Sequence, residues 1–394
     1  MVIDTPAADA DRIAWVGQSC RLLRATGDEF AQTQPFAGLT IGVSIHLEPK
    51  TAALLIALQR GGAQIVATGN LNSTQPATVA YLRERGITII GEQTKDAALH
   101  ASFLDAIVAR RPALLLDNGG DLFARYAAAP YDALLGGTEE TTSGRMRLVP
   151  LRAQIGRPVL VINDSPIKQF AENRHAVGQS IFESFLRFTN RSTNGRSVTV
   201  FGYGACGTGV AACFRNAYSV VTVVDASPVR TLEAHLDGFI TPSRERAIAS
   251  ADVLITATGA RGVLTADDLP LLRDGTILAN VGHFPHEIDV AAIESSAAML
   301  TAETSADEIT TWRLADGRTV YLLGRGHMLN LAGPRPLGNS IESMDLGFTL
   351  QARCLEAIAR GKIGRDSCVV PVPPAIDAQV ASDYLVLARA ASGG

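Results

Sequence analysis

The sequence has few of the features that mark several common classes of protein. Aromatic residues make up only 6% of its 394 residues, and its five cysteines are scattered, with no Cys-x-x-Cys pair. An odd number of dispersed cysteines argues against a disulfide framework, and the lack of Cys-x-x-Cys pairs argues against structural zinc. We therefore expect no metal and a reducing, cytoplasmic compartment.

Long apolar runs and a one-sided charge are absent as well. No stretch reaches the roughly 18–20 apolar residues of a membrane helix. The first 15 residues are acidic and lack the apolar region of a secretory signal. The net charge is −4, with 35 basic and 39 acidic residues interspersed and no basic stripe. We expect neither a membrane nor a nucleic acid as partner.

The remaining composition is that of an α/β protein. Hydrophobic residues make up 47% of the chain. Its 394 residues are too many for one ordinary core and suggest two domains, or three. Strand-like and helix-like segments alternate, at 39–46, 51–60, 64–67, 77–85, 87–90, 114–117 and 159–162. This alternation predicts doubly wound parallel sheets.

The strongest local motif is a glycine-rich loop between a strand and a helix. Strand 197–201 precedes the loop, whose sequence is Gly202-Tyr203-Gly204-Ala205-Cys206-Gly207, and strand 220–224 ends at Asp225. A G-x-G-x-x-G loop in this context, with an acid about 20 residues on, is the fingerprint of a dinucleotide site. The alternative is a glycine-rich turn in an unrelated α/β protein.

Each part of this loop has a physical role in binding a dinucleotide. Gly202 permits the tight turn, Gly204 lets the backbone approach a pyrophosphate, and Gly207 allows close packing of helix on strand. The helix N-terminus stabilises the phosphate charge. Asp225 should accept hydrogen bonds from both ribose hydroxyls, which favours NAD over NADP.

Further segments on both sides of the loop complete a wider pattern, from about residue 39 to about residue 375. They are 45–46, 70–75, 116–122, 139–144, 163–165, 168, 172–173, 280–284 and 330–331. With these segments in this order, the sequence resembles the S-adenosyl-L-homocysteine hydrolase family. The resemblance implies a substrate domain made of 1–177 and 338–394, with an NAD-binding Rossmann domain, 178–337, inserted between its two parts. It also implies a homodimer or homotetramer.

The resemblance further implies a reaction on a small-molecule nucleoside. Tightly held NAD oxidises the 3′-hydroxyl, which makes the 4′-hydrogen acidic because it then lies α to a ketone. Loss of that proton expels the 5′ substituent, water adds, and NADH reduces the ketone. The reaction needs a base at the 3′ oxygen, a base at C4′ and an acid/base near C5′.

Catalytic roles can be carried over residue by residue. Lys168, Glu172 and Asn173 lie where the family oxidises the 3′ position, and Glu140 lies in the turn that contacts ribose and nicotinamide. His46 matches the acid/base at the leaving group, and His283 should lie where the cofactor domain meets the sugar. Without the resemblance, an exposed lysine, a helix-capping turn and structural histidines would be the expected interpretations.

The cofactor contacts that the resemblance implies form a longer set. They are Thr141, Thr142, Ser143, Asn173, Gly202, Gly204, Ala205, Cys206, Gly207, Asp225, Asn280, Gly282, His283 and Asn330.

Several positions near the substrate depart from the family pattern. Asn118, which we include among the catalytic groups, replaces an aspartate and cannot exchange a proton at neutral pH. Lys50 replaces a glutamate that accepts from adenine, so it would suit a carbonyl, carboxylate or phosphate, or point elsewhere. Glu48 replaces a threonine, and Asn339 replaces a histidine near adenine. We expect substrate contacts from these last three residues and from Gln75.

Two further departures affect the cofactor and the 3′ chemistry. Glu172 replaces an aspartate and is one methylene longer. The sequence ends soon after 369–373, without the family tail whose lysine and tyrosine reach the NAD of a neighbouring subunit. The resemblance then predicts that NAD dissociates faster than is usual in the family.

We therefore expect a paralogue that acts on a modified nucleoside. If water leaves and is not added back, the product is a 4′,5′-unsaturated nucleoside, as in some nucleoside antibiotics. Glu48, two residues after His46, would then supply the carboxylate that is missing at position 118. The alternatives are a genuine S-adenosyl-L-homocysteine hydrolase, an inactive NAD-binding regulator and an ordinary dehydrogenase that releases NADH.

Overall fold

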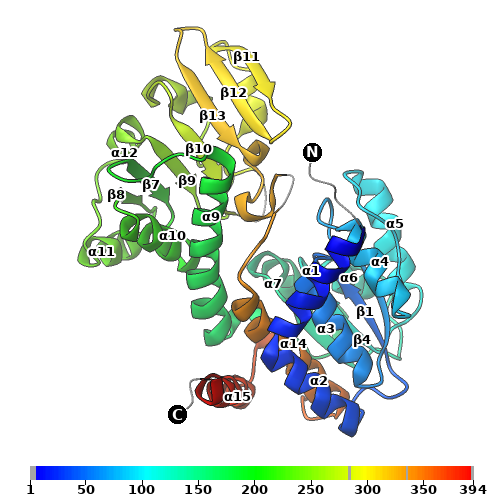
Figure 1. Ribbon diagram of the computed structural model, residues 1–394. Helices are drawn as coiled ribbons and strands as arrows, with labels where there is room; N and C mark the ends of the chain where they lie inside the picture. Colours follow the sequence, from blue (N-terminus) through cyan, green and yellow to red (C-terminus); the bar gives the residue numbers. More distant parts are fainter. Residues whose placement is uncertain (1–5, 283–284, 334–335, 392–394) are drawn as a thin grey trace. The chain divides into compact units, whose positions relative to one another are not determined.

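The computed structural model describes residues 6–282, 285–333 and 336–391, and the chain forms two compact units (Figure 1). The first unit consists of Met1–Gln169 and Ile341–Gly394, and the second, Phe170–Ser340, is inserted between these parts. The sequence predicts these joints at 177/178 and 337/338. The first joint lies within a π-helix, Lys168–Ala176, whose first two residues belong to the first unit.

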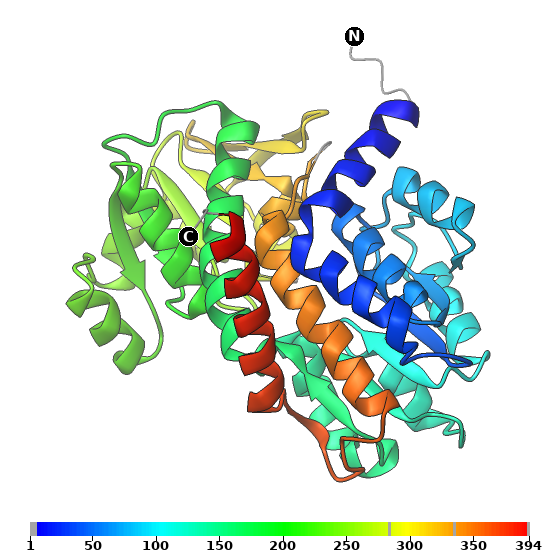
Figure 2. The same ribbon diagram turned by 60° about the horizontal axis from the view of Figure 1, so that its bottom comes forward.

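The first unit contains a parallel sheet of seven described strands in the order β14-β6-β5-β4-β1-β2-β3. These are β1 (Thr40–Ser44), β2 (Gln64–Thr68), β3 (Thr88–Ile89), β4 (Leu114–Asp117), β5 (Gly136–Glu139), β6 (Val159–Val161) and β14 (Cys368–Pro371). Its α-helices are α1 (Pro6–Ser19), α2 (Arg21–Thr33), α3 (Pro49–Arg60), α4 (Pro76–Glu84), α5 (Ala97–Val108), α6 (Asp121–Ala128), α7 (Thr142–Leu148), α8 (Arg152–Ile155), α14 (Ile341–Ala359) and α15 (Pro374–Ala391). In Figure 2, α15 lies alongside α14.

The order of strands in this sheet reverses between β1 and β4. From β1 the chain proceeds outward to β2 and β3, and then returns to β4 on the other side of β1 before it continues to β5 and β6. In open parallel sheets, the crevice at the carboxyl ends of the strands at such a switch point is the usual ligand site. The segments that follow β1, β2, β4 and β5 carry His46, Asn70, Asn118 and Glu140 respectively.

Strand β5 is not predicted by the sequence, because Gly-Gly-Thr-Glu lacks the apolar, β-branched run of a buried strand. All four residues are nevertheless buried, and β5 pairs with both β4 and β6. A Cβ on Gly137 would lie 1.8 Å from the carbonyl oxygen of Leu115. The glycine is therefore required for the close approach of the two strands.

The second unit contains a mixed sheet of seven described strands in the order β11-β12-β13-β10-β9-β7-β8. These are β7 (Ser197–Phe201), β8 (Val220–Val224), β9 (Val253–Thr256), β10 (Ile277–Asn280), β11 (Met299–Thr304), β12 (Ile309–Leu314) and β13 (Thr319–Leu323). The α-helices are α9 (Val177–Thr189), α10 (Ala205–Asn216), α11 (Pro228–Leu236), α12 (Arg244–Ser250) and α13 (Val290–Glu294). The doubly wound α/β fold is confirmed, with β11 and β12 as an antiparallel extension of the second sheet.

Both faces of the second sheet are covered by buried apolar side chains. One cluster joins Val198 and Val200 of β7 to Phe214 of α10. A separate cluster contains Leu254 of β9 and Trp312 of β12. This two-sided burial explains why β7 and β8 read as continuous β-branched runs in the sequence.

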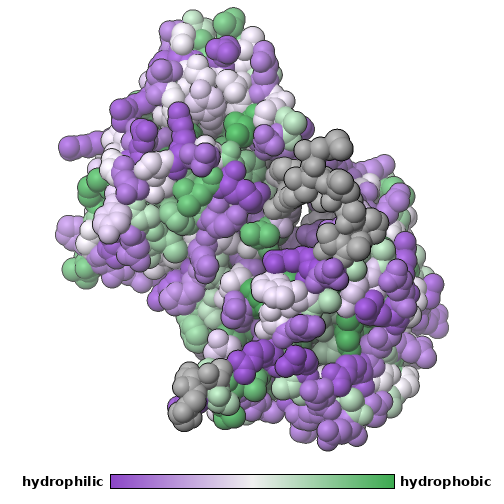
Figure 3. Space-filling model, viewed as in Figure 1, coloured by the Kyte–Doolittle hydropathy of each residue, from purple (hydrophilic) through white to green (hydrophobic). Residues whose placement is uncertain are grey.

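The surface in view in Figure 3 is mainly hydrophilic, with small separate apolar patches. None of the helices in the described ranges combines the length and the apolar composition that a membrane span requires.

Asp345 of α14 caps the N-terminus of α2 from a different part of the chain. Its two carboxylate oxygens accept the N–H groups of Leu22 and Leu23 at 2.8 and 2.7 Å. Burial raises the pKa of Asp345 to about 6. Because Cys20 at the N-cap makes no capping bond with its side chain, the start of α2 relies on Asp345.

We predict that Asp345→Asn destabilises the first unit by about 1–3 kcal/mol, because an amide can accept only one of these two buried N–H bonds. Hydrogen exchange at Leu22 and Leu23 should accelerate, and the urea midpoint should fall. The exposed Asp307 offers a matched control, Asp307→Asn, that should change neither. Unchanged exchange at Leu22 and Leu23 in the Asp345 variant would contradict the capping role.

Candidate active site

Glu140, at the carboxyl end of β5, is a buried carboxylate with two donors in the first unit. Its Oε1 lies 3.0 Å from Lys168 Nζ, and its Oε2 accepts Asn118 Nδ2 at 2.7 Å. Burial alone would raise the pKa of Glu140, but the charge of Lys168 and the hydrogen bonds from Asn118 and Lys168 outweigh burial and lower it. Glu140 is therefore ionised at neutral pH.

The charge on Glu140 fixes the orientation of two amides behind it. Since an ionised carboxylate can only accept, Asn118 must present its amide nitrogen to Glu140 and its oxygen to the next residue. That oxygen accepts Asn70 Nδ2 at 2.9 Å, and Asn70 Oδ1 faces the Ser44 hydroxyl at 3.3 Å. The donors therefore run in one direction, from β1 through the ends of β2 and β4 to Glu140.

His46 follows β1 and lies near this chain of donors. Its Nδ1 is 2.7 Å from Ser73 Oγ, and its charge, when the ring is protonated, helps to lower the pKa of Glu140. The hydroxyl of Thr51 donates to the carbonyl of His46 at 2.6 Å, which fixes the backbone at the start of α3. The structure thus brings together His46, Asn118, Glu140 and Lys168, which the sequence places 122 residues apart at most.

Glu48 and Lys50 form a buried ion pair in the same unit. Lys50 Nζ lies 2.8 Å from Glu48 Oε2. Burial raises the pKa of Glu48, although the charge of Lys50 opposes this effect. Gln75 lies at the start of α4, and its N–H donates to the carbonyl of Leu47 at 2.9 Å, which ties its segment to the residues after β1.

Asp117 and Glu139 are neighbouring carboxylates that hold the site loops in place. Asp117 accepts the N–H groups of Leu122 and Phe123 at the start of α6 at 2.8 and 3.0 Å. Glu139 accepts the N–H groups of Gly119, Gly120 and Thr141. The two residues are cross-strand partners in β4 and β5, so the loops after these strands share one polar support.

Burial raises the pKa of Asp117 to about 7 and that of Glu139 to about 8. Because both values lie above those of an unfolded chain, the pair contributes most stability at low pH. This contribution is lost as the pH rises through about 7 and 8.

In the second unit, the three glycines of the fingerprint have distinct surroundings. Gly202 has a φ of +95°, and a Cβ on Gly207 would lie 1.9 Å from the carbonyl oxygen of Gly202. A Cβ on Gly204, at the N-cap of α10, would meet nothing within 4 Å. Gly202 and Gly207 are thus required by the protein itself, whereas Gly204 leaves open space at a helix N-terminus, which fits a pyrophosphate.

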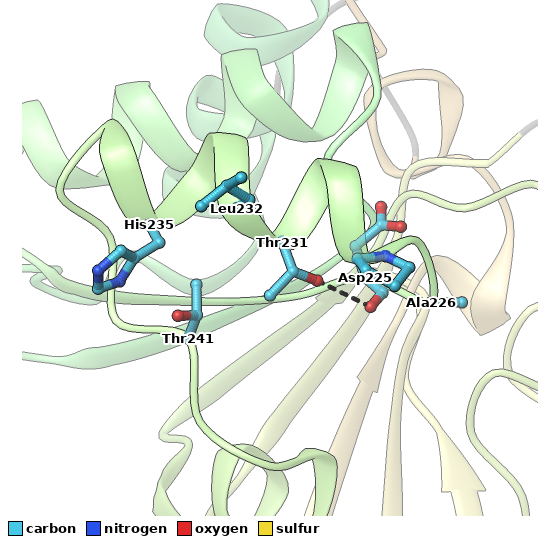
Figure 4. Close-up of a pocket in the computed structure, with 7 residues that line it drawn as sticks. Asp225, Ala226, Thr231, Leu232, His235 and Thr241 are labelled. Carbon is cyan, nitrogen blue, oxygen red and sulfur yellow. Dashed lines mark hydrogen bonds between the residues drawn. The ribbon is translucent and has the colours of Figure 1, made fainter.

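Asp225 follows β8 directly and supports the glycine-rich loop. Its Oδ2 accepts the N–H of Tyr203 at 2.7 Å, and its Oδ1 accepts the N–H of Ser227 at 2.8 Å. The Thr231 hydroxyl donates to the main-chain oxygen of Asp225 (Figure 4). Both residues line an open hollow of about 380 Å³. Ala226, Leu232, His235 and Thr241 also line this hollow.

Asn330 places a buried acceptor in the second unit. Its Nδ2 donates to Ser180 Oγ at 3.0 Å and to Asn339 Oδ1 at 3.1 Å. Its Oδ1 is buried without a hydrogen-bond partner among the described residues. An unpaired acceptor of this kind fits an amide donor such as the nicotinamide carboxamide. The open space at Gly204 and the acceptor on Asn330 together fit NAD.

Asn339 connects this group to Glu172. Its Oδ1 accepts Ser180 Oγ at 3.1 Å, and its Nδ2 donates to Glu172 Oε1 at 3.3 Å. The sequence predicts that Asn339 contacts the substrate. In the structure its side-chain amide bonds to protein groups instead.

Asn280 is fully buried and bonds to the backbone around Gly282. Its Oδ1 accepts the N–H of Gly282 at 2.8 Å, and its Nδ2 donates to the carbonyl of Gly326 at 2.9 Å. Sequence reasoning missed the buried Glu287, which accepts the N–H groups of Thr258 and Gly259 at 2.9 and 2.8 Å. Glu287 and Asn280 thus shape the loops after β9 and β10. The only sequence signal for the role of Glu287 would have been an acidic residue near glycine-rich loops, and its burial becomes evident only in the structure.

The remaining predicted residues have local partners or lie outside the description. The hydroxyl of Thr141 accepts the N–H of Gly144 and caps α7, Ser143 Oγ lies 3.1 Å from it, and Thr142 accepts Asn163 Nδ2 at 2.7 Å. Ala205 and Cys206 form the first turn of α10, and Asn173 lies in the π-helix. His283 lies outside the described residues. No cluster of metal-ligating side chains occurs within 6–282, 285–333 and 336–391.

We predict that Gly204→Ala weakens NAD binding more than tenfold and leaves the melting temperature unchanged, because its methyl group enters only the space for the pyrophosphate. Calorimetric titration of NAD into the cofactor-free protein and thermal unfolding would measure both effects. Gly207→Ala is the matched comparison, and it should lower the melting temperature because its Cβ meets the carbonyl of Gly202. Normal NAD affinity in Gly204→Ala would contradict the assignment.

Comparison with known proteins matches two family descriptions. Residues 11–130 match S-adenosyl-L-homocysteine hydrolase, and residues 173–335 match its NAD binding domain. The adenosylhomocysteinase of Thermotoga maritima is 36% identical over 376 residues, which cover 94% of this chain and 92% of that protein. The S-inosyl-L-homocysteine hydrolase of Methanopyrus kandleri is 35% identical over 377 residues, which cover 94% and 88%.

Among solved structures, a putative D-3-phosphoglycerate dehydrogenase from Ralstonia solanacearum superimposes with a TM-score of 0.50. It is 12% identical, and the match covers 83% of this chain and 96% of that one, so it shows the fold alone. The sequence relatives share about a third of their residues with this chain over nearly its whole length. The chain belongs to the S-adenosyl-L-homocysteine hydrolase family and is a hydrolase-family enzyme with an NAD-binding domain.

Proposed function

We propose that this enzyme oxidises the 3′-hydroxyl of a modified nucleoside, removes the 4′ proton and eliminates the 5′ substituent as water. The product is a 4′,5′-unsaturated nucleoside. The observation that carries the proposal is the place of Asn118, whose amide is held between Asn70 and the ionised Glu140. An amide at this point donates a hydrogen bond but cannot exchange a proton.

NAD, when bound, supplies the acceptor for the hydride from C3′ and returns that hydride at the end of the turnover. Lys168, in the form that has lost its own proton, is the candidate base for the proton of the 3′-hydroxyl, and Glu140 holds it in place at 3.0 Å. A base must then take the 4′ proton, and His46 is the candidate acid for the oxygen that leaves C5′. The net change is the loss of one water molecule, with the redox state of the nucleoside unchanged.

The substitution at position 118 affects the proton transfers at C4′ and C5′ most. After the 5′ group has left, a hydrolase must deprotonate water and protonate carbon, and each transfer needs a group that titrates. The Asn118 amide removes one such group from the site. Because loss of water and its re-addition are one step in opposite directions, the substitution slows both, and the alkene is retained when the 3′-ketone is reduced before water returns.

A second candidate is hydrolysis of a nucleoside–homocysteine thioether, which the similarity to adenosylhomocysteinase and S-inosyl-L-homocysteine hydrolase favours. The Lys50 ammonium carries three N–H donors and no acceptor, so it suits a base with a carbonyl better than the amino group of adenine. Its ion pair with Glu48 uses one of these donors. An inosyl substrate would therefore fit this residue better than an adenosyl one.

We predict that the enzyme exchanges the 4′-hydrogen of its substrate in deuterated water, because oxidation at C3′ acidifies that position whether or not a group leaves. Mass spectrometry would follow S-adenosylhomocysteine, S-inosylhomocysteine, adenosine, inosine and a ketohexose nucleoside. We expect exchange and loss of water with a nucleoside that carries a 5′-hydroxyl. Release of homocysteine would establish the hydrolase instead, and no exchange with any compound would support an inactive regulator.

We predict that Asn118→Asp moves the acid limb of the kcat/KM profile to higher pH by about one unit or more, because a second carboxylate beside Glu140 raises the pKa of one of the two. Asn118→Ala is the control that removes the amide without adding charge, and it should lower activity without this displacement. An unchanged acid limb in Asn118→Asp would show that Glu140 does not set the limb.

A further inference from the structure

The loop after β2 supplies a hydroxyl group that contacts His46. Ser73 Oγ lies 3.0 Å from the main-chain oxygen of Asn70 and 2.7 Å from His46 Nδ1. A carbonyl oxygen can only accept, and a serine hydroxyl has a single proton to donate. If that proton is donated to Asn70, then Ser73 Oγ must accept a proton from His46. In that arrangement His46 carries its proton on Nδ1.

The direction of this bond determines which nitrogen of the neutral ring is basic. With the proton on Nδ1, the lone pair of the imidazole is on Nε2. We propose that Ser73 is a positioning residue that sets the tautomer of His46, so that Nε2 binds the second proton of the imidazolium and delivers it to the oxygen that leaves C5′, after which the ring is the neutral Nδ1–H form. This proposal rests on the proposed function, because it names the atom that serves the elimination.

The backbone around Ser73 is fixed by several independent bonds. The N–H of Asn70 donates to the carbonyl of Ile45 at 3.2 Å, and the N–H of Ser73 donates to the carbonyl of Asn70 at 3.1 Å. Next to this turn, the buried His100 bonds through Nε2 to the carbonyl of Gly69 at 2.9 Å. The carbonyl that accepts from Ser73 is thus held before any substrate binds, and it does not depend on the histidine.

Asn70 links this device to the carboxylate of the site. Its main-chain oxygen orients Ser73, and its side-chain amide donates to Asn118, which in turn donates to Glu140. One residue therefore helps to orient both the imidazole and the amide that keeps Glu140 ionised. Neither Asn70 nor Ser73 contributes a titratable group, so both act only through geometry.

The direct test is the tautomer of His46, which does not depend on activity. Proton–nitrogen correlation spectra of the ¹⁵N-histidine-labelled protein would be recorded, with His46→Gln to assign the signals. We expect Nδ1–H in the wild type and a mixture or Nε2–H in Ser73→Ala. Nε2–H in the wild type would overturn the proposal, because Ser73 would then donate to the ring.

The kinetic test compares two steps in the same enzyme. We expect Ser73→Ala to slow loss of the 5′ group about 10–100-fold, a part of what general acid–base catalysis contributes. Exchange at C4′ should change much less, because it does not need the leaving group to be protonated. Ser73→Thr keeps the hydroxyl and should restore the elimination. An equal loss of both steps, or no loss, would overturn the proposal.

A matched control separates this role from a merely structural one. Ser102 Oγ donates to the carbonyl of Leu99, also three residues earlier in the chain, at 2.6 Å, and no histidine in the described part of the chain shares a hydrogen bond with it. Ser102→Ala should alter neither the tautomer nor the ratio of the two steps. If the wild type shows no 4′ exchange, the proposed function is wrong. The spectra still test the tautomer of His46, so the two failures can be told apart.

Discussion

The first unit is organised around the need to keep a buried charge on Glu140. An isolated buried carboxylate would take up a proton, and the charge survives only because Lys168 and Asn118 both contact it. Each of these partners must be held in turn, Asn118 by Asn70 and Lys168 by the π-helix that carries it. The direction of every hydrogen bond in this chain follows from the single fact that Glu140 can only accept.

The neighbouring acids show that burial alone does not make a carboxylate catalytic. Asp117 and Glu139 lie one residue before Asn118 and Glu140, are at least as buried, and bond to backbone N–H groups of the site loops. Alternation along a strand sends successive side chains to opposite faces. In each pair the two residues therefore have different partners. Asp117 and Glu139 bond to the backbone of the loops, whereas Asn118 and Glu140 bond to side chains of the site.

The sequence predicts the fold and the glycine-rich loop because both depend on local patterns. Apolar runs, β-branched residues and glycines at fixed offsets determine β4, β7 and β8, whose predicted bounds agree with the structure. Strand β5 escapes prediction because its glycines are explained only by the approach of β4. The series of hydrogen bonds from Ser44 to Glu140 could not be predicted from the sequence either. The four segments that form it are far apart in sequence and meet only when the fold brings them to one edge of the sheet.

The two asparagines at positions 118 and 339 act alike in their separate units. Asn118 donates to Glu140 in the first, and Asn339 donates to Glu172 in the second. The family pattern has a titratable aspartate and histidine at these positions, so each unit has exchanged a proton carrier for an amide that supports a carboxylate. The exchange at position 118 removes a proton carrier while Lys168 and the dinucleotide loop remain, so it affects the proton transfers at C4′ and C5′ more than the redox step. The redox groups that remain are the part of the family pattern that both candidate reactions share.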